Sequence, residues 1–248
     1  MPSFNKNTIR THVFLILLLF SISTSEGQLN PGLVKIYKGN KSLPGTWLTG
    51  KVPVKATKFR GDSALSLNEI EKALGKYPKN FNSPLKNIFL VGTLTLSGKK
   101  CPGTHTDENI YIAARHNDDI EKLFHREFAE MLLKYYPGNF NPEEWNKTRF
   151  SLKLNTDPYA TDKTISQQEL NPVLFQEGYL TNYSLTGWES DFATYAENLF
   201  AGGRQFWQVV DFYPLIKQKA LLVIKFYHSL YPIYTENWFR FIADFRLF

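Results

Sequence analysis

The stretch "NDDIEKLFHREFAEMLLKYYPGN", residues 117–139, predicts one long helix at the centre of the fold. Asn117 is the expected N-cap, the two aspartates that follow it suit the positive end of a helix, and the Pro-Gly pair ends it. At 100° per residue, most apolar side chains share one broad face; these are Leu123, Phe124, Phe128, Met131 and Tyr135. The segment therefore predicts a helix that packs against a core along most of its length.

An acidic residue lies within this apolar face. Glu127 falls in its middle, Arg126 and Glu130 lie together at one edge, one turn apart, and His125 lies beyond the other edge. An ionised carboxylate in apolar surroundings is costly unless it is paired, bound to a metal or protonated. Glu127 therefore marks a candidate functional site. The simpler alternative is a buried glutamate that is satisfied by the backbone or by an arginine.

Residues 1–27 have the features of a secretory signal peptide. Lys6 and Arg10 precede the apolar run "VFLILLLFSIS", residues 13–23, and small residues follow where cleavage is expected. This run is too short to favour a transmembrane helix. We therefore expect a secreted protein, extracellular or periplasmic, with no stable membrane span after removal of the signal.

The composition is that of a folded domain. Hydrophobic residues make up 43% of the 248-residue chain and charged residues 21%, which is enough for a core of useful size. The net charge of +6 is spread along the sequence without a Lys/Arg block, so nucleic acid binding is not expected. Cys101 is the single cysteine, which excludes an internal disulfide. We expect one domain over residues 28–248, with an N-terminal region at 28–86 and a core at 87–248.

Periodicity and turn signals predict the order of the remaining elements. A helix is expected over 66–78 with Ser66 as its cap, strands over 87–98 and 108–116, and a second strong helix over 188–202. Further helices finish the chain, and most of their many aromatic residues are expected in the core. This order predicts an α+β fold in which a small sheet packs against a helical bundle.

These segments resemble the zincin-type metallopeptidases whose third metal ligand is a glutamate on a second helix. The first helix of that group carries the motif H-E-x-x-H, and residues 126–130 read "REFAE" here. The second helix of some relatives reads like E-D-F-A-E, and "ESDFATYAE", residues 189–197, has that look, with Tyr183 ahead of it. The resemblance covers about residue 87 to the C-terminus. It implies a zincin-like fold, with a small sheet packed against an active-site helix and a C-terminal helical subdomain.

The resemblance also implies roles for individual residues. In the family, two histidines hold zinc and the glutamate between them activates zinc-bound water. Glu127 matches that general base, whereas Arg126 and Glu130 stand at the two histidine positions. The acidic ligand of the second helix is Glu189 or Asp191, and the register of that helix leaves both open.

Two interpretations of the altered motif follow. In the first, Arg126 supplies the positive charge that zinc supplies in the relatives, in a salt bridge with Glu130. The protein is then a catalytically impaired cleft that binds a peptide or protein. In the second, His125 joins Glu130 and a second-helix acid in a rearranged zinc site of an active endopeptidase. His116 is a further candidate ligand there, and Tyr183 is expected to steady the oxyanion.

A third interpretation is a secreted interaction domain, unrelated to zincins, that uses the aromatic residues of its C-terminal helices. It predicts that Glu127 lies far from Glu189 and Asp191. In all three interpretations His105, within "PGTHTDEN" at residues 102–109, is expected to be an exposed loop residue.

Overall fold

The computed structural model describes residues 34–38, 46–47, 52–60, 62–114, 119–148 and 169–244. The predicted signal peptide and His116 lie outside these ranges. Within them the chain forms a mixed fold of helices and two small sheets, which confirms the predicted α+β class.

The main sheet has four strands in the order β1-β4-β8-β7. They are β1 (Lys35–Lys38), β4 (Asn87–Val91), β8 (Asn109–Ala113) and β7 (Gly103–His105). The first three run parallel, whereas β7 runs antiparallel to β8 and lies at the edge. Because side chains alternate along a strand, one face of this sheet presents isoleucines and leucines to the helices, and the other presents Phe89 and Tyr111.

A second, antiparallel sheet packs on the Phe89 and Tyr111 face. Its strands, in order, are β2 (Thr46–Trp47), β3 (Val52–Ala56), β5 (Leu94–Leu96) and β6 (Lys99–Cys101). The segment 87–98, predicted as one strand or hairpin arm, is therefore divided between two sheets. The chain bends at Gly92, where its backbone pairs with Thr57.

Helix α2 (Ser63–Leu74) begins one turn earlier than predicted. The expected cap, Ser66, lies inside the helix, where its hydroxyl donates to the Asp62 carbonyl. Asp62 is the N-cap, because its carboxylate accepts hydrogen bonds from the amides of Ala64 and Leu65.

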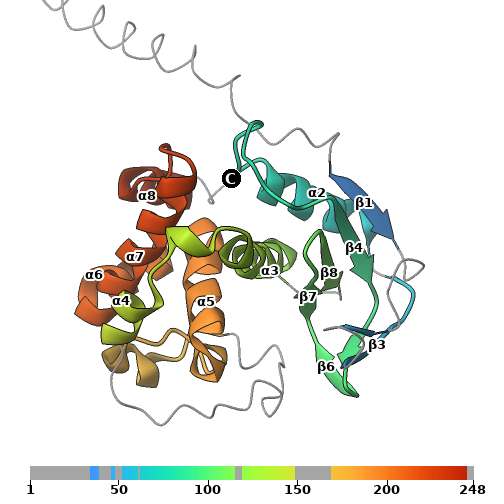
Figure 1. The fold of residues 1–248 in the computed structure, drawn as a ribbon, viewed down its shortest axis with the longest axis horizontal. Coiled ribbons are helices and arrows are strands. Elements are labelled where there is room, and N and C mark those ends of the chain that lie inside the picture. Colours follow the sequence, from blue (N-terminus) through green and yellow to red (C-terminus); the bar gives the residue numbers. More distant parts are fainter. Residues whose placement is uncertain are drawn as a thin grey trace, which may run out of the picture.

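The predicted central helix is α3 (Ile120–Tyr135). Its N-cap is Asp119, which accepts from the amide of Lys122, while the expected cap Asn117 lies outside the described residues. The helix lies between the main sheet and α5 (Trp188–Ala201), and it also packs against α2 (Figure 1). It is consequently buried on nearly all sides.

The remaining helices form a bundle around α5. They are α4 (Pro142–Lys147), α6 (Gly203–Phe212), α7 (Pro214–Leu230) and α8 (Glu236–Asp244), with short 3-10 turns η1 (Pro137–Asn139), η3 (Pro172–Glu177) and η4 (Tyr183–Thr186). Phe226, Tyr227, Tyr234 and Phe239 are buried, as predicted for the C-terminal aromatic residues, whereas Phe241 is mostly exposed. Among the described residues, no helix is long and apolar enough to span a bilayer.

A buried ion pair joins α5 to α7. Lys219 of α7 has no exposed surface, and its Nζ lies 2.8 Å from Oδ2 of Asp191 and 2.6 Å from the carbonyl oxygen of Gly178. The ammonium also lies 4.1 Å from the ring centroid of Tyr179. A buried ion pair adds little to the free energy of unfolding compared with apolar packing in the same place. Loss of one partner, however, leaves an uncompensated buried charge, which is strongly destabilising.

Lys219→Met should therefore lower the free energy of unfolding by about 3–5 kcal/mol, because it strands the Asp191 carboxylate in the core. Lys225→Met on the same helix removes only an exposed ion pair, in which Nζ of Lys225 lies 3.1 Å from Oε2 of Glu144. This substitution should change the free energy of unfolding by less than about 1 kcal/mol. Urea unfolding followed by circular dichroism measures both. Equal effects of the two substitutions would contradict the role given to the buried pair.

Candidate functional site

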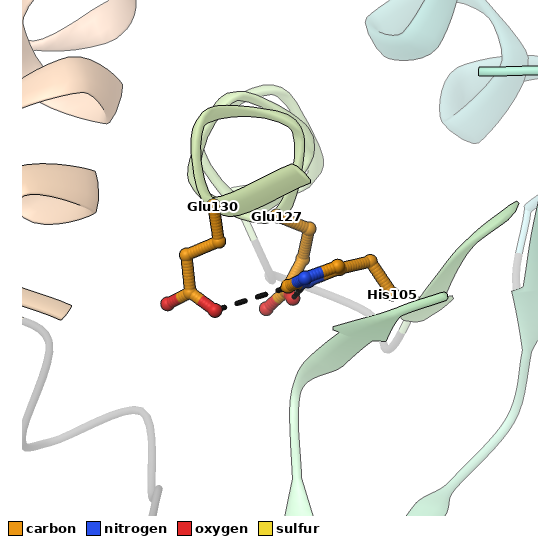
Figure 2. Close-up of side chains that lie close together, drawn as sticks. All are labelled: His105, Glu127 and Glu130. Atoms are coloured by element: carbon orange, nitrogen blue, oxygen red, sulfur yellow. Dashed lines mark hydrogen bonds and ion pairs between the residues drawn. The ribbon is translucent and has the colours of Figure 1, made fainter. Parts of the chain in front are cut away.

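Three polar side chains converge between β7 and α3 (Figure 2). Nδ1 of His105 lies 3.1 Å from Oε2 of Glu127 and 3.8 Å from Oε2 of Glu130. One ligand atom from each residue lies within 4.8 Å of the other two, a spacing at which the three could hold a metal ion. Glu127 and Glu130 come from the same face of α3, and His105 comes from the edge strand of the sheet.

The position of His105 corrects the expectation of an exposed loop residue. Its side chain is only 5% exposed, because a tight turn pairs the Thr106 amide with the Asn109 carbonyl and folds residues 103–105 back as strand β7. Gly103 and His105 are two residues apart and therefore share the face of β7 that looks at α3. A side chain at Gly103 would lie 2.9 Å from Oε1 of Glu127, so this glycine lets the carboxylate approach the strand.

Arg126 forms a buried ion pair with Glu197 of α5. Its Nε lies 2.6 Å from Oε2 of Glu197, and its Nη2 also contacts that oxygen. Burial by itself lowers the pKa of Arg126, but the charge of Glu197, with Tyr183 and Glu127, raises it above the ordinary value, so the guanidinium is charged. The predicted salt bridge between Arg126 and Glu130 is therefore wrong, because the Arg126 side chain turns toward α5.

Tyr183, at the start of η4, joins the site from the other side. Its hydroxyl donates a 3.1 Å hydrogen bond to Oε1 of Glu130, and its ring centroid lies 5.2 Å from the guanidinium carbon of Arg126. The structure thus brings together four of the residues singled out from the sequence; they are Arg126, Glu127, Glu130 and Tyr183.

His125 lies away from this group, which corrects the prediction that it joins Glu130 as a metal ligand. The residue is fully buried, and its Nδ1 lies 2.9 Å from the hydroxyl oxygen of Tyr77. The ring stacks on Phe200 at a centroid distance of 4.6 Å. His125 therefore belongs to the core between α3 and α5, although the sequence placed it beyond the edge of the apolar face.

The two acids proposed for the second helix are also placed elsewhere. Asp191 is held by Lys219, and Glu189 is exposed in the first turn of α5. The acid of α5 that faces α3 is Glu197, which the sequence analysis missed. The signal was present, because Glu197 stands in the run "TYAENLF" among small and apolar residues, just as Glu127 stands in "HREFAEM". The placement of Asp191 beside Lys219 and of Glu189 at the surface agrees with what the third interpretation predicted for these two acids, whereas Glu197 is the acid that joins α5 to α3.

The pKa of the Glu197 carboxyl is raised by its burial between α3 and α5. Burial raises its pKa from the ordinary value of 4.5 to about 6, although the charge of Arg126 acts in the opposite direction. The carboxyl is therefore ionised at neutral pH and becomes neutral under mildly acidic conditions.

These residues do not fit a zinc ion that is coordinated in the manner of the H-E-x-x-H motif. The first histidine position carries a guanidinium, which is always charged and has no lone pair to offer. Glu197, the acid of α5 that faces α3, is already bonded to this guanidinium. The one remaining set of donors around Glu127, within the described part of the chain, consists of His105, Glu127 and Glu130, on the β7 side of α3.

The sequence matches no protein-family model and no curated protein. The fold, however, is similar to the crystal structure of a protein from Bacteroides caccae named "putative zinc-binding metallo-peptidase". The TM-score is 0.53 at 15% sequence identity, and the match covers 97% of this chain and 93% of the other. This similarity shows a metallopeptidase-like fold.

The raised pKa of Glu197 predicts how stability depends on pH. The folded state holds the Glu197 proton more tightly than the unfolded state, so this group stabilises the fold below pH 4.5 and loses that contribution as the pH rises through about 6. The free energy of unfolding of the wild type, minus that of Glu197→Gln, should fall by about 2 kcal/mol between pH 4 and pH 7. Urea titrations at several pH values measure this difference. Glu189→Gln is the control for loss of a carboxylate from the same helix, and a flat difference for Glu197→Gln would contradict the assignment.

Proposed function

We propose that this chain is a secreted, zincin-like protein that binds extended peptides beside α3 and has lost zinc-dependent hydrolysis. The observation that carries the proposal is the Arg126–Glu197 ion pair, because a guanidinium stands at the first histidine position of the motif and is held by a buried acid of α5. The guanidinium supplies the positive charge that the buried Glu197 carboxylate needs, so that acid needs no metal. In this proposal residues 28–248 are one domain, released after the signal peptide is removed.

The edge strand β7 supports peptide binding. Thr106 pairs with Asn109 and Pro102 accepts from Ala113, so residues 102, 104 and 106 direct their backbone groups at β8. The backbone groups of Gly103 and His105 then point away from β8. Within the described ranges, β8 is the only strand paired with β7. An extended peptide can add to such an edge through main-chain hydrogen bonds, and it would pass beside Glu127 and Glu130.

The general base and the tyrosine have non-catalytic roles in this proposal. Glu127 and Glu130 give the site beside β7 an acidic character, and Tyr183 holds Glu130 in place. The partner is therefore a peptide or an extended segment of a protein, and not a nucleic acid. The alternative is an active zinc-dependent endopeptidase with rearranged ligands, for which the donor set of His105, Glu127 and Glu130 is the supporting observation.

Hydrogen exchange at the edge strand tests peptide binding even while the natural ligand is unidentified. In the free protein the amides of Thr104 and Thr106 should exchange slowly, because they bond to β8, whereas those of Gly103 and His105 should exchange rapidly. Addition of a peptide selected from a display library should slow the exchange at Gly103 and His105. NMR-detected exchange resolves the four amides, and a bound peptide that leaves both outward amides unprotected would contradict pairing with β7.

Restoration of the motif tests the loss of hydrolysis. Arg126→His with Glu130→His recreates H-E-x-x-H and frees Glu197 from its ion pair. The double variant should bind one zinc ion per chain and cleave fluorescently labelled casein, whereas the wild type should not cleave it. Addition of Glu127→Gln to the double variant should keep the zinc and abolish cleavage, because only the general base is removed.

Chelator-sensitive cleavage of casein by the wild type would overturn the proposal in favour of the active endopeptidase. A double variant that folds and binds zinc but does not cleave would show that more than the two ligand positions has changed. In that case the binding proposal would stand on the hydrogen-exchange result alone.

A further inference from the structure

The side chains of His105, Glu127 and Glu130 form a group that the Arg126–Glu197 pair does not use. We propose that these three residues bind a divalent transition-metal ion of the Zn²⁺ class, between β7 and α3. The site shares Glu130 with the second histidine position of the H-E-x-x-H motif, but it takes its other ligands from Glu127 and from His105 of β7 rather than from α5. The inference does not rest on peptide binding. Figure 2 shows all three side chains directed into one space below α3.

The distances suit such an ion. In a tetrahedral zinc site with bonds of about 2.0–2.2 Å, neighbouring ligand atoms lie about 3.3 Å apart. Here the His105 nitrogen lies 3.1 Å from Glu127 and 3.8 Å from Glu130. One imidazole and two carboxylates are donors that Zn²⁺, Co²⁺ and Mn²⁺ accept. The two negative charges balance a divalent ion, and water fills the fourth position.

Neighbouring groups hold the two carboxylates in place. The Tyr183 hydroxyl donates a hydrogen bond to Oε1 of Glu130. The other carboxylate oxygen of Glu130, Oε2, is the one that lies near His105. Gly103 supplies the space on β7 that the Glu127 carboxylate occupies. Partners of this kind, which orient the ligands without touching the ion, are a general requirement of metal sites.

Lys134 competes with the proposed metal ion for the imidazole of His105. Its Nζ lies 2.8 Å from Nε2 of His105, and an ammonium can only donate, so Nε2 must accept and Nδ1 carries the proton that Glu127 receives in a hydrogen bond. A metal on Nδ1 requires the other tautomer, with a proton on Nε2 that repels Lys134. Lys134 is exposed and can turn toward solvent when the ion binds. It therefore sets the affinity of the site.

Calorimetric titration of the untagged mature chain with ZnCl₂, together with the visible absorption spectrum of added Co²⁺, tests the site. The wild type should bind one ion, and His105→Ala and Glu130→Gln should each abolish that binding. His228→Ala, at an exposed residue of α7, and Glu144→Gln, at a half-exposed residue of α4, are the matched controls and should leave zinc binding unchanged. Lys134→Met should tighten binding about tenfold, because it removes the group that competes for the imidazole.

Absence of one-to-one binding in both the wild type and Lys134→Met would overturn the inference, whatever the state of folding of the His105 variant. Binding that survives His105→Ala but is lost in Glu197→Gln would place the ion between α3 and α5. That outcome would overturn both this inference and the proposed loss of the zincin zinc site. Binding that survives in every variant would mean an adventitious ion only and would also overturn the inference.

Discussion

The charges on α3 constrain the rest of the molecule. This helix lies between the main sheet and the helical bundle, so each ionised side chain on it must find a partner on another element. Glu121 meets Lys72 of α2 and Lys76 just beyond its end, Arg126 meets Glu197 of α5, and Glu127 meets His105 of β7. These are three directions around one helix axis. A rotation of α3 by one residue would separate all three pairs and leave buried charges without partners, which is far more costly than a shift of apolar side chains.

The Arg126–Glu197 pair has the largest consequence for the site. Both side chains are almost completely buried, at 3% and 1% exposure, so the guanidinium cannot leave without stranding the acid. A buried arginine can in this way supply the positive charge that a neighbouring buried acid needs, but a guanidinium is not the Lewis acid on which zinc-dependent hydrolysis relies.

Helix α5 is positioned at two points by the same kind of interaction. Asp191, in its first turn, is paired with Lys219 of α7, and Glu197, almost two turns later, is paired with Arg126 of α3. The two acids are six positions apart, which is about 240° beyond one full turn, so they face different neighbours. Glu189 and Asp191 were predicted as ligands because their segment resembles the E-D-F-A-E signature, whereas the helix that each acid of α5 faces is decided only by the packing.

The sequence by itself determined the local features of this protein. The periodicity of residues 120–135 predicted the central helix, the burial of Glu127 and the position of Glu130 one turn from Arg126, because these follow from 100° per residue. Only the tertiary structure decided the partners. His105 lies in a short segment of Gly, Pro and Thr without periodicity, and it reaches Glu127 because a tight turn folds that segment onto the sheet edge beside α3. Arg126 pairs with Glu197, which is 71 residues away in the sequence, rather than with Glu130, which is four residues away. The reason is that burial favours a partner that closes the gap between two packed helices.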